Sequence, residues 1–207
     1  MFQWISIFGL GAVIGLVLLH ALIFPCGSGP RLSAMGLIRR GVHLLTMLFL
    51  EQQLTWIGRI RKLVYLLAML AVLVLIVTGF GPVVFGSRIA GWLLMIHATF
   101  AGVFVFCMAF LAVTWANAFI CTMQSRTSEC GCPLEACLRR AGFWMMLLLT
   151  LPISLTMVLS MYPIFGTQGQ DMLLWIHRYC TLCFVMVAIV QTYLVIRSRI
   201  LKDCKTV

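Results

Sequence analysis

Long apolar runs separated by short polar stretches dominate the chain. Five runs, at about residues 2–24, 62–80, 89–118, 141–162 and 171–196, show no alternation of apolar and polar positions. Each is long enough, at about 20 residues or more, to cross a bilayer as a helix. Backbone groups in lipid must be satisfied within helices or a closed barrel, and barrel strands would alternate. We therefore expect an all-α integral membrane protein.

The segment over residues 31–62 is too often interrupted by Arg, Glu and Gln to span. Its mixture of Arg, Leu and Trp is typical of an amphipathic helix in the headgroup region. We expect two parts in the chain. Residues 1–60 hold an N-terminal transmembrane helix and this interfacial segment, and residues 61–200 form a four-helix transmembrane bundle.

The composition supports a membrane protein and argues against nucleic-acid binding. The 207 residues are 63% hydrophobic and 10% charged, with a mean hydropathy of +1.10. A soluble domain of this size could not cover so much apolar surface. The net charge of +10 is typical of basic loops that meet anionic lipid headgroups and set orientation.

The basic residues also predict an orientation. With five spans, nearly all of them fall on one side, which should be cytoplasmic. We expect the N-terminus outside and the C-terminus inside a bacterial or archaeal cytoplasmic membrane. The first run has no positive n-region and no clean cleavage site, so it is expected to stay as a helix. The basic residues on the cytoplasmic side are Arg31, Arg39, Arg40, Arg59, Arg61, Lys62, Arg126, Arg139, Arg140, Arg197, Arg199, Lys202 and Lys205.

A shift of 80 residues reveals an internal repeat. It aligns LLMIH, ending at His97, with LLWIH, ending at His177, together with an upstream Phe-Gly pair. Two of only four histidines are matched, which apolar composition alone would not readily produce. The repeat units, about 61–120 and 140–198, are helix pairs. Paired helices preserve topology, so His97 and His177 should lie at the same depth, roughly 10 Å from the outer end.

Two histidines that face each other within the membrane need a bonding partner between them. Each neutral imidazole has one donor and one acceptor, so the two rings do not readily satisfy each other. A haem iron ligated from both sides would resolve this, with each remaining N–H given to the protein. Helix packing or a proton path remains an alternative, whereas zinc or copper lacks further ligands. The residues expected to surround a porphyrin are Gly91, Trp92, Ala98, Phe100, Ala101, Gly102, Phe104 and Phe184.

Four helices with LLMIH and LLWIH on the second and fourth resemble the core of the cytochrome b families. The five-helix, N-out layout is similar to the haem-bearing gamma and anchor subunits of nitrate reductase, formate dehydrogenase and hydrogenase. The resemblance covers about two thirds of the chain and is architectural. It implies an electron-transfer subunit that exchanges electrons between the quinone pool and an iron–sulfur or cytochrome c type partner. Arg178, beside a ligand, would then be a candidate for a haem propionate contact.

This chain also departs from those families. Respiratory cytochrome b has a second histidine 13 or 14 residues along each ligand helix, where this chain has Phe110 or Leu111 and Val190 or Gln191. The repeat therefore supports one haem b. His20 and His43 both lie near the cytoplasmic face and could hold a second haem there, but histidine near headgroups is also ordinary.

The cysteines support two further hypotheses. Four of them share the inner loop region and could hold an iron–sulfur cluster or zinc, although their spacing matches no standard pattern. Cys180 and Cys183 form a CxxC, which would suit a membrane thiol–disulfide oxidoreductase. A non-redox membrane scaffold is the remaining alternative, and a chain of this size would act within a larger complex. The four loop cysteines are Cys121, Cys130, Cys132 and Cys137.

Overall fold

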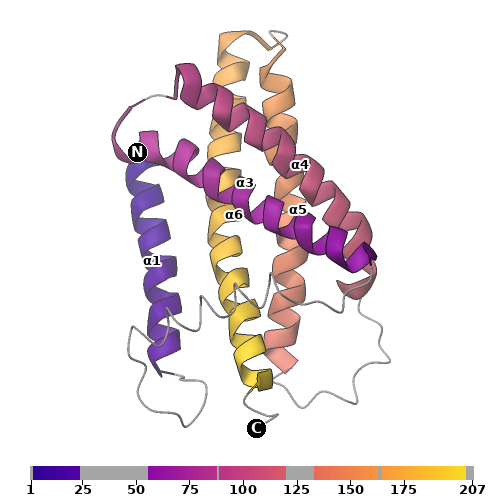
Figure 1. The fold of residues 1–207 in the computed structure, drawn as a ribbon. Coiled ribbons are helices and arrows are strands. Elements are labelled where there is room, and N and C mark those ends of the chain that lie inside the picture. Colours follow the sequence, from indigo (N-terminus) through magenta and orange to yellow (C-terminus); the bar gives the residue numbers. More distant parts are fainter. Residues whose placement is uncertain (1, 24–55, 88, 120–132, 163–164, 204–207) are drawn as a thin grey trace.

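The computed structural model describes residues 2–23, 56–87, 89–119, 133–162 and 165–203, and these form an all-helical bundle (Figure 1). Each of the five helices is long and apolar enough to cross a membrane, which confirms the expected all-α membrane fold. In chain order the helices are α1 (Phe2–Ile23), α3 (Trp56–Val84), α4 (Gly91–Phe119), α5 (Pro133–Ser160) and α6 (Gly166–Asp203).

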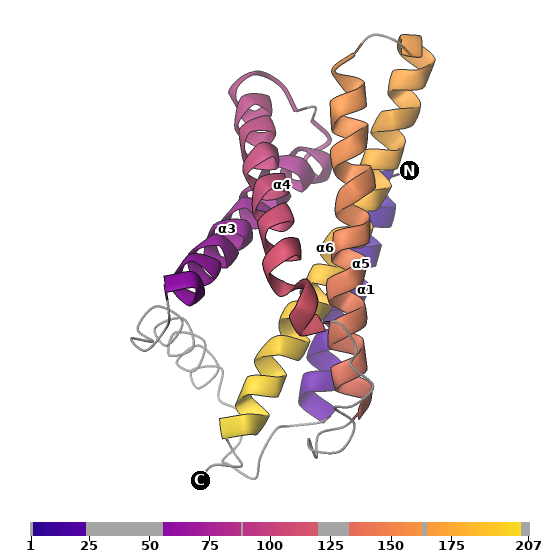
Figure 2. The same cartoon turned by 90° about the vertical axis from the view of Figure 1, so that its right-hand side faces the viewer.

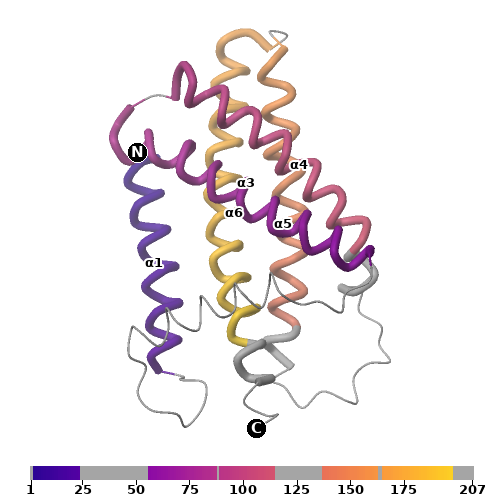
Figure 3. The backbone as a smooth tube through the Cα atoms, viewed as in Figure 1, coloured from indigo at the N-terminus to yellow at the C-terminus, as the bar shows by residue number. Residues whose placement is uncertain are grey.

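Successive helices run in opposite directions through the bundle. The backbone trace descends in α1, rises in α3, descends in α4, rises in α5 and descends in α6 (Figure 3). Phe2 and Asp203, the first and last described residues, therefore lie towards opposite ends of the bundle, and α4 and α6 run the same way. This is the relation that a parallel repeat of two helix pairs requires.

The bundle is built from two helical hairpins and one flanking helix. Helix α3 packs mainly against α4, and α5 packs mainly against α6, while α1 lies beside α6. The α3–α4 hairpin crosses the α5–α6 hairpin at an angle (Figures 1 and 2). Helices α4 and α5 touch less extensively than the members of either hairpin, so the hairpins are the main packing units.

A small core joins the hairpins, and most of the remaining surface is apolar. The rings of Phe104 and Phe184 meet edge to face, with centroids 5.3 Å apart. These residues occupy the same position in the two repeat units. Outside the core, Leu148, Leu151 and Leu155 of α5 are each more than half exposed. Such a surface suits lipid, where helices gain nothing by hiding leucine.

Three of the described helices, α3, α5 and α6, are longer than the apolar runs that predicted them. Helix α3 begins at Trp56 rather than at 62, so Arg59, Arg61 and Lys62 lie in its first turns. Long basic side chains can reach the headgroups from within a helix, so charge alone does not end it. The expected boundary at residue 60 therefore falls inside α3. Most of the predicted interfacial segment lies outside the described residues.

Helix α6 also begins earlier than expected, at Gly166 instead of 171. His177 is 11 residues into α6, or about 16 Å, whereas His97 is six residues into α4, or about 9 Å. The α5–α6 hairpin extends beyond the α3–α4 hairpin at this end (Figure 1). The longer hairpin offsets the deeper position of His177 along its helix.

Candidate functional site

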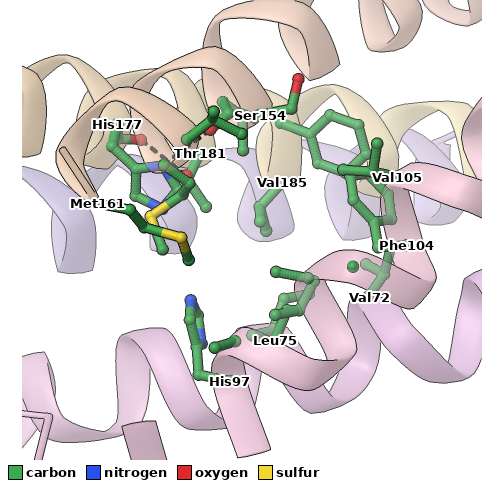
Figure 4. Close-up of a pocket in the computed structure, with 18 residues that line it drawn as sticks. Val72, Leu75, His97, Phe104, Val105, Ser154, Met161, His177, Thr181 and Val185 are labelled. Atoms are coloured by element: carbon green, nitrogen blue, oxygen red, sulfur yellow. Dashed lines mark hydrogen bonds between the residues drawn. The ribbon is translucent and has the colours of Figure 1, made fainter. Parts of the chain in front are cut away.

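A cavity of about 310 Å³ lies between the two hairpins and contains both repeat histidines in its walls. His97 and His177 point toward one another across it, from α4 and α6 (Figure 4). The cavity is otherwise mostly apolar. Its lining comprises Val72, Leu75, Ile76, His97, Ala98, Ala101, Gly102, Phe104, Val105, Ile153, Ser154, Met157, Val158, Met161, His177, Thr181, Phe184 and Val185.

The lining follows the repeat. Helix α6 supplies His177, Thr181, Phe184 and Val185. The residues 80 positions earlier in α4, namely His97, Ala101, Phe104 and Val105, all line the cavity as well. Positions spaced by about four and seven residues share one helix face, so each helix presents the same stripe. The cavity is therefore formed by equivalent faces of the two units.

The ring of His97 is held from behind by α3. Its Nδ1 lies 2.8 Å from the hydroxyl oxygen of Thr78. A Cβ atom at Gly79 would lie only 3.3 Å from the Cε1 atom of the same ring. Thr78 therefore supplies a hydrogen-bond partner for Nδ1, and Gly79 leaves room for the ring to approach the helix.

The ring of His177 is held in the same way by α5. Its Nδ1 lies 3.3 Å from the hydroxyl oxygen of Thr156 and 3.3 Å from the carbonyl oxygen of Ile153. Each histidine is thus hydrogen-bonded through Nδ1 to the preceding helix of its own hairpin. The opposite ring nitrogen, Nε2, is left for the cavity.

Met161, just after α5, lies between the two rings (Figure 4). Its side chain is 70% exposed although it lines the cavity. The thioether therefore stands at the mouth of the site, where a long unbranched side chain can change rotamer.

Five of the eight residues expected to surround a porphyrin line this cavity. Ala98, Ala101, Gly102, Phe104 and Phe184 line the cavity. Three other predicted wall residues do not line it, for reasons of helix rotation and packing.

Trp92 lies about 140° around α4 from His97, because five residues separate them at 3.6 residues per turn. It is 80% exposed. Phe100 packs against the core cluster, and Gly91 begins α4 with a positive φ of 57°. None of these three residues lines the cavity.

The sequence did not predict which residues of α3 and α5 line the cavity. It also did not predict that Thr78 and Thr156 contact the histidines. Thr78 lies 19 residues before its histidine, and Thr156 lies 21 residues before. At the shift of 80, Thr78 aligns with Val158, so the match is hidden. A shift of 78 pairs the threonines, and it also pairs Leu75 with Ile153 in the lining.

His20 lies away from this cavity, at the contact between α1 and α6. Its Nδ1 is 2.7 Å from the hydroxyl of Tyr193 and 3.1 Å from Nη1 of Arg197. His20 and Tyr193 rings also meet edge to face. The proposed partner His43 lies outside the described residues, so the pairing of these two histidines stays a prediction.

Arg178 does not line the histidine cavity. It contributes to a separate hollow of about 320 Å³ together with Gln3, Ser87 and Trp175. Its guanidinium carbon lies 5.9 Å from the centroid of the Phe2 ring. A contact from Arg178 to a group held by His177 would need the side chain to leave that ring.

The cysteines give no support to a metal or disulfide site among the described residues. Cys121, Cys130 and Cys132 lie outside them, and Cys137 is an exposed free thiol in α5. Cys180 and Cys183 are free thiols on α6, and neither lines the histidine cavity. Within the described ranges, no group of three or more His, Cys, Asp or Glu side chains could hold a metal ion.

Comparison with known proteins adds nothing to the geometry: no protein-family model, curated protein or solved structure matches the chain.

Proposed function

We propose that this protein is a b-type cytochrome membrane subunit that holds haem b between His97 and His177. The observation that carries the proposal is the pair of imidazoles on opposite walls of one apolar cavity, each held through Nδ1. It would transfer electrons between a membrane quinone and a partner redox protein of iron–sulfur or cytochrome c type.

The residues present fit a bis-histidine haem in donor type and in wall chemistry. Two neutral imidazoles are the usual axial ligands of such a group, and their second nitrogens are normally hydrogen-bonded to the protein. Ala98, Ala101 and Gly102 are small enough to let a flat ring approach α4. The volume of about 310 Å³ is at the lower end for ligand sites, so Met161 would turn aside to admit a porphyrin.

When bound, haem b supplies reversible one-electron chemistry through its iron. The chain's own contribution is ligation by the two Nε2 atoms and a dry apolar wall. Phe104, Phe184 and Val185 are almost fully buried and keep water from one end of the cavity. An apolar shell of this kind controls solvent access and thereby the redox potential.

The setting of this site in the cell is part of the same proposal. The basic residues favour a bacterial or archaeal cytoplasmic membrane with the N-terminus outside. In that orientation the histidine cavity lies nearer the outer face, since α4 and α6 begin at the end where α1 begins.

The test is a reduced-minus-oxidised visible spectrum of the purified full-length protein with haem quantitation. We expect a b-type α band that is lost in His97→Ala and in His177→Ala. Met95→Ala, at a side chain 61% exposed on α4, is the matched control and should keep the band. A wild-type protein without an α band would exclude the proposal.

Haem quantitation also tests whether the chain binds a second haem near His20. One haem per chain, unchanged by His20→Ala, would leave His20 as a packing residue against Tyr193. Two haems per chain, with half lost in His20→Ala, would assign His20 as a ligand.

A further inference from the structure

We propose that Thr78 and Thr156 are positioning residues that hold His97 and His177 as the Nδ1–H tautomer. The consequence is that the lone pair of each ring is on Nε2, which faces the cavity. This inference concerns the geometry of the free imidazoles, and its consequence for redox chemistry rests on the haem proposal above.

The hydroxyl of Thr78 has a single proton, and its hydrogen bonds fix where that proton goes. A threonine hydroxyl has one proton to donate and two lone pairs to accept with. The Thr78 hydroxyl donates its proton to the carbonyl oxygen of Val74, at 2.7 Å. Toward Nδ1 of His97, at 2.8 Å, the oxygen can then only accept, so the proton of that hydrogen bond belongs to Nδ1.

The second unit repeats this arrangement. The Thr156 hydroxyl donates to the carbonyl oxygen of Pro152, at 2.7 Å. It therefore accepts from Nδ1 of His177. The carbonyl oxygen of Ile153, also 3.3 Å from Nδ1, can never donate. The Nδ1–H form of His177 thus follows from two independent acceptors.

The two sites differ in how much depends on the threonine. Thr78 is the acceptor found for Nδ1 of His97 among the described residues. His177 keeps the Ile153 carbonyl if Thr156 loses its hydroxyl. Removal of the hydroxyl should therefore disturb His97 strongly and His177 weakly. If the two threonines had only a structural role, there would be no reason for the effect at His97 to exceed the effect at His177.

The expected functional consequence is a change in ligand strength. An Nδ1–H that donates to the protein fixes ring orientation and raises the basicity of the ligating nitrogen. A more basic ligand favours the oxidised iron. Loss of the hydroxyl should therefore raise the midpoint potential, more for Thr78→Val than for Thr156→Val.

The direct test is nitrogen NMR of the full-length protein labelled with ¹⁵N- and ¹³C-histidine and prepared under haem limitation. We expect the ring proton of His97 on Nδ1 in the wild type, and a mixture of tautomers in Thr78→Val. Thr78→Ser should restore the wild-type pattern, since serine keeps the hydroxyl. A wild-type His97 protonated on Nε2 would overturn the inference, whether or not haem binds.

The second test is a redox titration of the haem-loaded protein. Thr99→Val is the matched control, because Thr99 also bonds back to its own helix but at an exposed position. The midpoint potential should rise in Thr78→Val, return in Thr78→Ser and stay unchanged in Thr99→Val. An unchanged potential and tautomer in Thr78→Val would reject the positioning role while leaving the haem proposal intact. A protein without haem would reject the haem proposal and leave the NMR result to decide the tautomer.

Discussion

At the scale of single residues, the site depends on two glycines with different roles. Gly79 is close to the ring of His97, so any side chain there meets the imidazole. Gly102 lines the cavity, and a Cβ atom there would meet nothing within 4 Å. The first glycine therefore makes room for the His97 ring, whereas the second leaves the cavity open.

Gly79→Val should displace the His97 ring. A Cβ atom would already lie 3.3 Å from Cε1, and the two further methyl groups of valine have less space. The expected result is loss of most of the α band in the visible spectrum with little change in expression. Gly81→Val, in the same helix and with nothing within 4 Å of its Cβ, is the control. Equal spectra for the two variants would contradict the close approach of Gly79 and His97.

Gly102→Phe should fill the cavity while both histidines remain. The large side chain would occupy space that the porphyrin needs, so we expect loss of most of the bound haem without loss of protein. Gly15→Phe, on an exposed face of α1 with open space around it, should bind haem normally. Full haem content in Gly102→Phe would mean that the group, if present, binds elsewhere.

At the scale of helices, α1 is tied to α6 near both of its ends. The Phe2 ring meets the ring of Tyr179 edge to face, with centroids 5.3 Å apart. At the other end His20 meets Tyr193. Because helices in lipid gain little from apolar contact alone, such polar and aromatic contacts count for more than the leucines between them.

Tyr193→Phe should loosen α1 without affecting the histidine cavity. It removes the 2.7 Å hydrogen bond to His20, and interhelical hydrogen bonds in membranes contribute about 0.6 kcal/mol on average. We expect a small fall in the thermal unfolding midpoint in detergent and an unchanged visible spectrum. Tyr162→Phe, at a side chain 54% exposed, serves as the control. A larger fall for Tyr162→Phe would contradict the assigned role of Tyr193.

At the scale of the whole molecule, the five described helices alternate in direction, so Phe2 and Asp203 lie towards opposite ends of the bundle. In a bilayer crossed by all five of these helices, the two residues would lie on opposite sides. The basic residues then predict which side is which.

Reporter fusions test that orientation. A fluorescent protein that matures only in the cytoplasm should be bright at the C-terminus. Alkaline phosphatase, which is active only outside, should be active when inserted at Ser87 in the connection between α3 and α4. If alkaline phosphatase fused at the C-terminus were active instead, the orientation would be the opposite one. The histidine cavity would then lie near the inner face.

The apolar runs and the internal repeat were enough to predict the helices and the pairing of His97 with His177. Apolar runs long enough to cross a bilayer leave helices as the solution here, so the five helices were predictable apart from their ends. The ends were missed because basic residues such as Arg59 and Arg61 extend a helix past its apolar run. The repeat paired His97 with His177 because copies of a helix pair preserve direction and face.

The surroundings of these two histidines follow from the packing of the helices. Which residues of α3 and α5 face the cavity depends on how each helix is rotated in its hairpin, and a nearly uniform apolar run carries no periodicity that reveals this rotation. Thr78 and Thr156 were hidden for a related reason. The stretch between threonine and histidine is two residues longer in the second unit, so the equivalence exists in space and is lost at a single sequence shift.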